Sequence, residues 1–156
     1  MKISPEELKL RINHFKNGLK RSGIKLTHQR LEIFNEVAES SNHPDVETIY
    51  KSVRKRVPTI SLDTVYRTLW MLLDMGLIST LGPLREKTRF DANMRLHHHF
   101  VCSECGMTYD FYSEEFDQLK IPEEVKAWGK VEKTQVEIMG LCSQCIKRKE
   151  KLKKKR

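Results

Sequence analysis

The four cysteines of the chain form two Cys-x-x-Cys motifs, Cys102 with Cys105 and Cys142 with Cys145. The tight turn of each motif lets both of its sulfurs reach one ion, so two motifs complete a tetrahedral shell of four thiolates, which suits zinc. A closed four-sulfur shell has no open position and therefore predicts a structural metal. Disulfides or a single-iron centre are the alternatives. The motifs are 36 residues apart, so the metal would join the C-terminal strand to an earlier hairpin.

Three consecutive histidines precede the first motif, in a segment whose pattern predicts a strand over residues 96–101. Side chains alternate along a strand, which puts His97 and His99 on one face and His98 on the other. A second strand is expected over residues 107–112, and a turn centred near residues 103 and 104 would put Asp110 near His97. Two imidazoles and a carboxylate on one face form a partial site for iron, manganese or zinc.

Four short helices are predicted before residue 77, each beginning after a residue that can cap a helix: Ser4, Thr27, Asp45 and Ser61. Strands are expected over residues 77–81 and 88–91, around a Gly-Pro turn that carries Arg85 and Lys87, with Arg89 in the second strand. Short helices closed by a basic hairpin indicate a winged helix, in which the helix from Ser61 enters the major groove of DNA.

That helix is expected to present polar and aromatic side chains outward: Thr64, Arg67, Thr68 and Met71, with Tyr66 near its start. Arginine can bridge guanine, and an aromatic ring or a threonine methyl can meet the methyl group of thymine. Trp70 is expected in the core rather than as a stacking platform for bases. Exposed arginine and tyrosine also occur in helical domains that bind no DNA, so the pattern by itself leaves both interpretations open.

The last sixty-five residues predict a small α+β unit. One further helix is expected from Glu115 to Trp128, interrupted by Pro122, and a final alternating strand is expected over residues 131–139. Three short strands leave an exposed sheet edge that pairs readily with its twin, which predicts a homodimer. A dimer also has the two-fold symmetry that palindromic operators require.

The net charge of +8 is unevenly distributed along the 156 residues. Residues 1–91 carry 16 Lys and Arg against 11 Asp and Glu, residues 92–146 carry 5 against 9, and residues 147–156 carry 8 against 1. We therefore expect a basic winged-helix DNA-binding domain over 1–91, a metal-binding dimerisation domain over 92–146 and a basic tail over 147–156. The tail reads as a solvated, frayed end, or alternatively as an arm that adds nonspecific affinity for phosphates.

Composition excludes several classes of protein. An apolar content of 38% is enough for a buried core, and no apolar run approaches the roughly 20 residues of a membrane helix. The N-terminus has no apolar signal-peptide core, so a cytoplasmic protein is expected. Thiols in a reducing compartment are more often metal ligands than disulfides.

Taken together, these motifs resemble the ferric uptake regulator family of bacterial metal-dependent transcription factors, over nearly the whole chain except the basic tail. The matching segments are GIKLTHQR at 23–30, His43-Pro44, TVYRTL at 64–69, TRFD at 88–91, the three histidines with their CxxC motif, and the closing CxxC motif. The resemblance implies a dimer with an N-terminal winged helix and a C-terminal dimerisation domain, an α+β fold.

The resemblance also implies two metal sites and a set of DNA contacts. Structural zinc would be bound by Cys102, Cys105, Cys142 and Cys145, and a regulatory Fe(II) or Mn(II) by His43, Asp91, His97, His99 and Asp110. Ligands from both domains would let the metal set their relative angle. Lys25 would contact the minor groove, while Tyr66 and Arg67, with Thr64 on the same helix, would face the major groove of a double-stranded operator.

Within the family, aspartate at position 110 resembles the peroxide-stress repressors, whereas iron sensors commonly have glutamate there. Asp91 argues against the zinc-sensing branch, but the Tyr66-Arg67 pair resembles the iron branch. The resemblance to the peroxide branch implies that iron-bound peroxide adds oxygen to His43 or His97, whereas manganese does not drive this step. An iron-responsive uptake repressor is the alternative. An additional hinge metal site is expected to be absent, because no histidine lies near Thr134.

Three other classes of function compete with this interpretation. A hydrolytic enzyme would use the His97, His99 and Asp110 site with a bound water, but no paired base or nucleophile accompanies it, so we expect no enzyme. A zinc-stapled structural or RNA-binding protein would be indifferent to iron and manganese. Cysteine-based redox sensing is disfavoured because all four thiols are committed to zinc.

Overall fold

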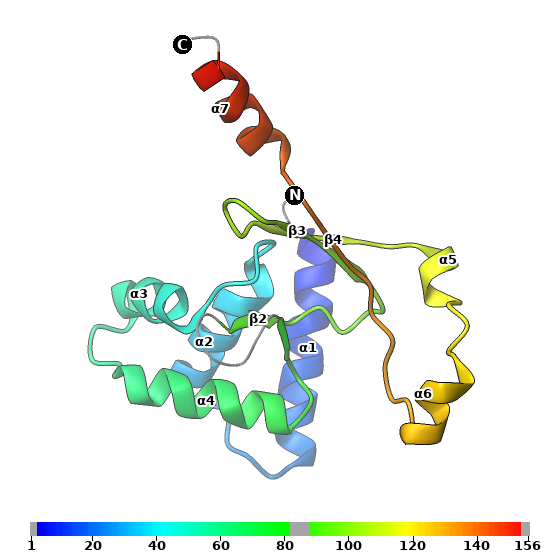
Figure 1. Ribbon diagram of the computed structural model, residues 1–156. Coiled ribbons are helices and arrows are strands. Elements are labelled where there is room, and N and C mark those ends of the chain that lie inside the picture. Colours follow the sequence, from blue (N-terminus) through cyan, green and yellow to red (C-terminus); the bar gives the residue numbers. More distant parts are fainter. Residues whose placement is uncertain (1–2, 82–87, 154–156) are drawn as a thin grey trace. The chain divides into compact units, whose positions relative to one another are not determined.

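The computed structural model of the protein describes residues 3–81 and 88–153 and divides the chain into two compact units, of which the first ends at Met94 and the second begins at Arg95. The first unit contains four helices and a two-stranded antiparallel sheet (Figure 1). Its elements are α1 (Pro5–Arg21), α2 (His28–Glu39), α3 (Val46–Arg56), α4 (Leu62–Asp74), β1 (Ser79–Leu81) and β2 (Arg89–Asp91).

All four predicted helix caps are confirmed. The side chains of Ser4, Thr27, Asp45 and Ser61 each accept a hydrogen bond from the backbone N–H three residues later. Each cap satisfies a donor that the first turn of a helix leaves without a partner. The helices pack around a core in which the Phe15 and Phe34 rings stack with centroids 4.3 Å apart. Of the predicted hairpin, β1 and β2 are confirmed, while the Gly-Pro turn, Arg85 and Lys87 lie outside the described residues.

Two predictions about α4 are wrong. Thr68 is buried and Trp70 is 47% exposed, the reverse of what was expected. Thr68 lies three residues after Val65 and four before Leu72, so it shares their inward face. Trp70 follows the buried Leu69, and a rotation of about 100° per residue turns it away from the core.

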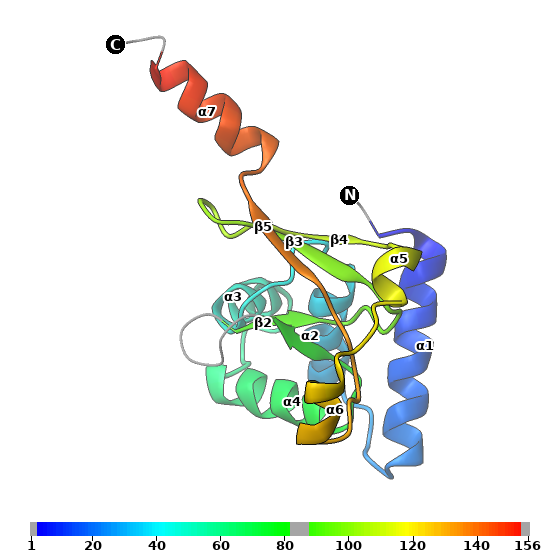
Figure 2. The same cartoon turned by 45° about the vertical axis from the view of Figure 1, so that its right-hand side comes forward.

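The second unit is built on a three-stranded sheet with the strand order β4-β3-β5, in which β3 is antiparallel to β4 and parallel to β5. Figure 2 shows β5 beside β3, with α5 and α6 in the connection that leads from β4 to β5. The elements are β3 (His98–Cys102), β4 (Thr108–Phe111), α5 (Glu114–Asp117), α6 (Glu123–Trp128), β5 (Glu137–Gly140) and α7 (Ser143–Lys153). The α+β class predicted from the sequence is confirmed.

The connection from β4 to β5 differs from the prediction. Instead of one interrupted helix there are two short ones, because Pro122 lies with extended ψ at the N-cap of α6 and the chain before it is not helical. The final strand is confined to residues 137–140, where β3 offers a partner. Residues 135 and 136 are held by other hydrogen bonds: the Gln135 amide donates to the His97 carbonyl, the Val136 N–H donates to His98 Nδ1, and the Val136 carbonyl accepts from the His99 N–H.

The prediction of a frayed basic tail is wrong for residues 147–153, which continue α7 as a regular helix to Lys153. Lysine, arginine, glutamate and leucine dominate this segment and all favour helix. In the described part of the chain, no helix combines the length and apolar character needed to cross a membrane.

Candidate metal centres and DNA-binding helix

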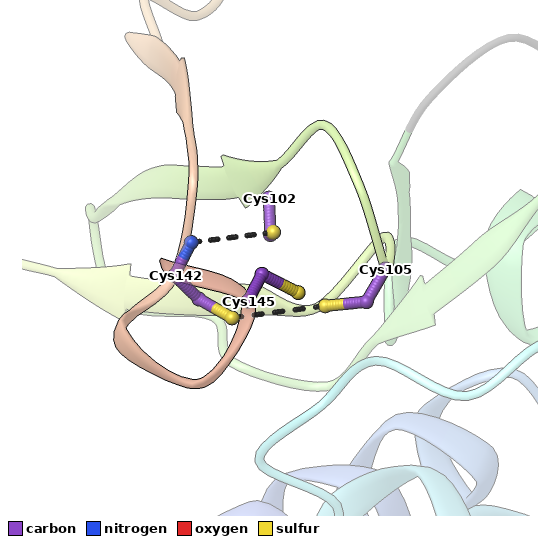
Figure 3. Close-up of side chains that lie close together, drawn as sticks. All are labelled: Cys102, Cys105, Cys142 and Cys145. Atoms are coloured by element: carbon purple, nitrogen blue, oxygen red, sulfur yellow. Dashed lines mark hydrogen bonds between the residues drawn. The ribbon is translucent and has the colours of Figure 1, made fainter. Parts of the chain in front are cut away.

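The four cysteines converge at one end of the sheet of the second unit, as Figure 3 shows. Cys102 ends β3, Cys105 lies in the turn before β4, Cys142 follows β5, and Cys145 is in the first turn of α7. Their sulfurs all lie within 4.8 Å of one another, and Cys105 Sγ is 3.8 Å from Cys142 Sγ. Four sulfurs bound to zinc at about 2.3 Å in a tetrahedron would be about 3.8 Å apart. The donor set and its geometry therefore fit zinc.

The surroundings of the cluster shift the pKa values of two of its thiols in opposite directions, and a charged residue beside the cluster pairs with α7. Hydrogen bonds from the backbone N–H groups of Cys105 and Cys142 lower the pKa of Cys102 to about 6, while burial raises the pKa of Cys145 to about 12. Glu104, between the two cysteines of the first motif, accepts from Lys149 Nζ at 2.8 Å and from Arg148 Nη2 at 3.4 Å. Lys149 in turn lowers the pKa of Glu104. The turn before β4 is thus tied to α7 by both sulfur and charge.

On the other part of the sheet, His97 and His99 share one face, as predicted. Their Nε2 atoms are 2.9 Å apart, and the Asp110 carboxylate is 3.4 Å from His99 Nε2 and 3.8 Å from His97 Nε2. The partner of Asp110 across the strands is His99 and not His97, which corrects the predicted register by two residues. The turn is longer than assumed because Gly106, at φ +70°, closes it and Cys102 N–H bonds to the Met107 carbonyl.

These three side chains have the geometry of a partial metal site. His97 Nδ1 is 2.6 Å from the Arg95 carbonyl, which can only accept, so Nδ1 carries the proton and Nε2 offers its lone pair. Donors bound at about 2.1 Å and at right angles are about 3.0 Å apart, close to the 2.9 Å between the two imidazole nitrogens. Both histidines are buried, so their rings are shielded from bulk water.

His98 points to the opposite face, also as predicted. Its Nε2 atom is 3.1 Å from the Asp117 carboxylate, and its ring packs edge-on against Phe116. His98 therefore joins α5 to the sheet and is separated from the face that carries its two neighbours.

The first unit holds a second imidazole and carboxylate pair. His43 Nδ1 lies 3.6 Å from Asp91 Oδ1, and both side chains are almost completely buried. His43 has a φ of +47°, a left-handed conformation that costs a non-glycine residue about 1–3 kcal/mol and is concentrated at functional sites. Arg89 stabilises this loop by donating to the carbonyls of Asn42 and His43. Arg89, predicted as part of a basic hairpin, thus has a local structural role.

The residues expected to contact DNA lie in the first unit, at the beginning of α4 and in the loop before α2. Tyr66 is 41% exposed, and the strongly exposed Arg67 has its guanidinium 3.8 Å from the Asp63 carboxylate. Thr64 is half-buried and shares a 2.8 Å hydroxyl hydrogen bond with Ser61. Lys25 is exposed, and its carbonyl accepts a hydrogen bond from Arg30.

Sequence reasoning did not single out Arg30 or Gln29. Both line a hollow of about 340 Å³ between the start of α2 and one flank of α4, together with Thr27, Thr64, Arg67, Thr68 and Met71. The guanidinium of Arg30, in the first turn of α2, donates to the carbonyl of Lys25 in the preceding loop. That loop has no periodic pattern, so hydrophobic periodicity gave no indication of this contact.

Comparison with known proteins identifies the fold and the class of function. The sequence profile of the Ferric uptake regulator family matches residues 21–139. This chain belongs to the ferric uptake regulator family. The resemblance inferred from the sequence motifs is therefore confirmed, and so is the combination of an N-terminal winged helix with a C-terminal α/β domain.

Individual members of the family are similar over most of the chain. A peroxide-responsive repressor PerR of Staphylococcus epidermidis is 30% identical over 128 residues, which cover 82% of this chain and 85% of that protein. The Helicobacter pylori ferric uptake regulator Fur, whose structure has three functional metal-binding sites, superposes with a TM-score of 0.70 at 25% identity and covers 94% of this chain and 97% of its own. The Campylobacter jejuni peroxide stress regulator superposes with a TM-score of 0.62 at 29% identity, and the match covers 83% of this chain and 94% of that protein.

Family membership defines the general activity. Proteins of the ferric uptake regulator family are metal-responsive transcriptional regulators that bind DNA, and so is this chain. The hydrolytic interpretation of the histidine and aspartate cluster is excluded on the same ground.

Proposed function

We propose that this member of the family is a homodimeric repressor that binds a double-stranded DNA operator when its regulatory metal is bound, and that senses hydrogen peroxide by oxidation of a histidine ligand. The observation that carries the proposal is the cluster of His97, His99 and Asp110, which joins two buried imidazoles to an aspartate. The similarity to peroxide-responsive repressors, at 27–30% identity, supports the same conclusion.

Zinc is the ion that we assign to the four cysteines, with a structural role. The closed thiolate shell leaves no position for a substrate or for an oxidant that binds the metal. When bound, Zn²⁺ would hold the end of β3, the turn before β4 and the start of α7 together.

The regulatory metal, Fe(II) or Mn(II), would take its ligands from both units of the chain. His97, His99 and Asp110 would come from the second unit, and His43 and Asp91 from the first, the pair that the family resemblance assigns to the same ion. An ion bound by ligands from both units makes their relative orientation depend on the metal, because binding favours the orientation in which all ligands are in place. That orientation would set the spacing of the two α4 helices of a dimer on the operator.

Peroxide sensing follows from the choice of metal. Fe(II), when bound, would pass electrons to the O–O bond of peroxide and so cleave it, whereas Mn(II) would not; in the overall balance both electrons come from the imidazole that is oxidised. Overall, one oxygen atom of the peroxide is inserted at an imidazole carbon of His43 or His97, and the other leaves as water. An oxidised ring is a poorer ligand, so the metal is lost and the DNA-binding orientation with it.

DNA contacts would come from α4 and from the loop before α2. Arg67 and Tyr66 would read base edges in the major groove, with Thr64 beside them, and Lys25 would reach the minor groove. The exposed positions of Tyr66, Arg67 and Lys25 support this assignment.

The experiment uses a duplex selected from a random-sequence pool by the full-length, Mn(II)-loaded protein. We expect this duplex to bind in the presence of Mn(II) or Fe(II) and to dissociate when the metal is chelated. Brief peroxide treatment should release the duplex from the Fe(II)-loaded protein only. Binding that is indifferent to iron and manganese would contradict the proposal and favour a zinc-stapled DNA-binding protein without a sensor.

An Fe(II)-responsive uptake repressor is the second candidate, and the pair Tyr66-Arg67 favours it because that pair resembles the iron branch of the family. This candidate predicts the same metal-dependent binding but no selective release of the iron form by peroxide. Peroxide treatment of the Fe(II)-loaded complex, the last step of the same experiment, therefore distinguishes the two candidate functions.

A further inference from the structure

One aromatic side chain on α4 is unexplained by the packing of the first unit. Trp70 is 47% exposed, although α4 buries Val65, Leu69 and Leu72 on its other side. At about 100° per residue, Trp70 lies nearly opposite the centre of this buried face. The side chain therefore projects from the outward face of the helix that the proposed function puts in the major groove.

Trp70 shares that outward face with two of the expected DNA contacts. Arg67 precedes it by three residues and Tyr66 by four, so both are its direct neighbours on the helix surface. The rise from Tyr66 to Trp70 is about 6 Å, roughly two base-pair steps of DNA. Two exposed carboxylates lie on the same side of α4, Asp63 one turn before Arg67 and Asp74 one turn beyond Trp70, so the stretch between them is the part of this face without negative charge.

We propose that Trp70 is a specificity-determining residue that places the apolar surface of its indole against a thymine methyl group, beyond the bases read by Tyr66 and Arg67. The major groove presents the methyl group of thymine as its one apolar feature, and apolar side chains recognise it. Arg67, whose guanidinium lies 3.8 Å from the Asp63 carboxylate, is the cationic side chain that this face of α4 offers to the DNA phosphates. This inference rests on the proposed DNA-binding function.

The two tryptophans of the chain allow each to be observed alone. Trp128 lies on α6 in the second unit and is 75% exposed, so it is a matched exposed tryptophan on a different element of the chain. The Trp128→Phe protein reports on Trp70, and the Trp70→Phe protein reports on Trp128. Both are loaded with zinc and Mn(II) and titrated with the selected duplex and with a scrambled duplex of the same composition.

We expect the selected duplex to quench the emission of Trp70 and to leave that of Trp128 unchanged. The Trp70→Ala substitution should weaken binding of the selected duplex by about tenfold, since one aromatic contact with a base is lost. Thymines of the selected duplex are then replaced one at a time by uracil, which lacks the methyl group. At one position this replacement should weaken binding by the unmodified protein about fourfold, which corresponds to the burial of one methyl group. At the same position, uracil should leave the affinity of the Trp70→Ala protein for the duplex unchanged.

Three results would overturn the inference. The first is no quenching of Trp70 emission, and the second is that Trp70→Ala weakens binding of the selected and scrambled duplexes equally. The third is that uracil lowers the affinity of the unmodified and Trp70→Ala proteins by the same factor. The fluorescence and Trp70→Phe measurements hold even if Trp70→Ala fails to fold. Failure of the full-length protein to select any duplex would instead contradict the proposed function itself.

Discussion

His97, His99 and Asp110 come together because two neighbouring strands pair, and most of this could be predicted from the sequence. Alternation from His97 into β3 assigns the two histidines to one face, and the return strand brings the aspartate to it. The predicted register was wrong because the length of a turn that contains a CxxC motif is not encoded in the alternation. His43 and Asp91 could not be predicted by pattern, since they are 48 residues apart, and only the family resemblance connected them to a metal.

Removal of one imidazole tests the regulatory site. His99→Ala should weaken Mn(II) binding by more than about 100-fold, because even residues that only support a ligand contribute 10–100-fold. Titration with Mn(II) of protein whose zinc is in place measures this. His14→Ala, at an exposed position of α1, is the control and should bind Mn(II) normally. Equal affinities in the two variants would remove His99 from the ligand set.

Loss of one thiolate tests the zinc assignment. Cys105→Ser should lower the zinc content from one ion per chain and reduce the melting temperature of the protein, because the turn before β4 loses its link to α7. Glu104→Gln is the matched control, since it changes the neighbouring residue and removes the ion pairs with Lys149 and Arg148 but no ligand. Metal analysis by mass spectrometry should find full zinc in this control. Full zinc in Cys105→Ser would contradict the four-thiolate site.

At the scale of elements, the helices were easier to predict than the strands. Each helix of the first unit has a capping residue and a periodic apolar face, two local signals that agree. The final strand was predicted too long because residues 131–135 alternate without a neighbouring strand to pair with in the described sheet. Trp70 was misplaced because its size suggested burial, whereas its angular position on α4 faces away from the core.

The packing of α1 against α2 depends on two stacked rings. Phe34→Ala should reduce the free energy of unfolding by about 3–5 kcal/mol, because it leaves a cavity beside Phe15 in a fully buried core. Urea denaturation followed by circular dichroism measures the change. Leu10→Ala on the exposed face of α1 should change the free energy of unfolding by less than about 0.5 kcal/mol. A loss below about 1 kcal/mol for Phe34→Ala would show that the core relaxes to fill the space.

At the scale of the whole molecule, charge is divided as the proposed function requires. The residues up to 91 are basic, the next fifty-five are acidic, and α7 with the following residues is strongly basic again. The helical form of α7 could not be predicted from charge alone, since a run of lysines is equally compatible with a solvated end. The helix instead begins at the Cys142–Cys145 motif, and Glu104 pairs with Arg148 and Lys149 in its second turn.

The basic surface of α7 should add affinity without specificity. Replacing Lys151 and Lys153 by glutamine should weaken binding to the selected and scrambled duplexes by the same factor, and lower the dependence of log affinity on log salt by about 1 to 2. Binding measured from low to moderate salt gives this slope. Glutamines at Lys9 and Lys16 on α1 serve as the control for loss of charge. A change in the ratio of the two affinities would mean that α7 contacts DNA bases.

Peptide mapping after peroxide treatment tests the central claim most directly. Separate samples of the zinc-loaded protein receive Fe(II) or Mn(II), are exposed to hydrogen peroxide, and are digested and analysed by mass spectrometry. The account predicts one added oxygen on the peptide that contains His43 or His97, in the iron sample alone. Unmodified histidines in both samples would contradict peroxide sensing and leave an iron-responsive repressor as the function of this member of the family.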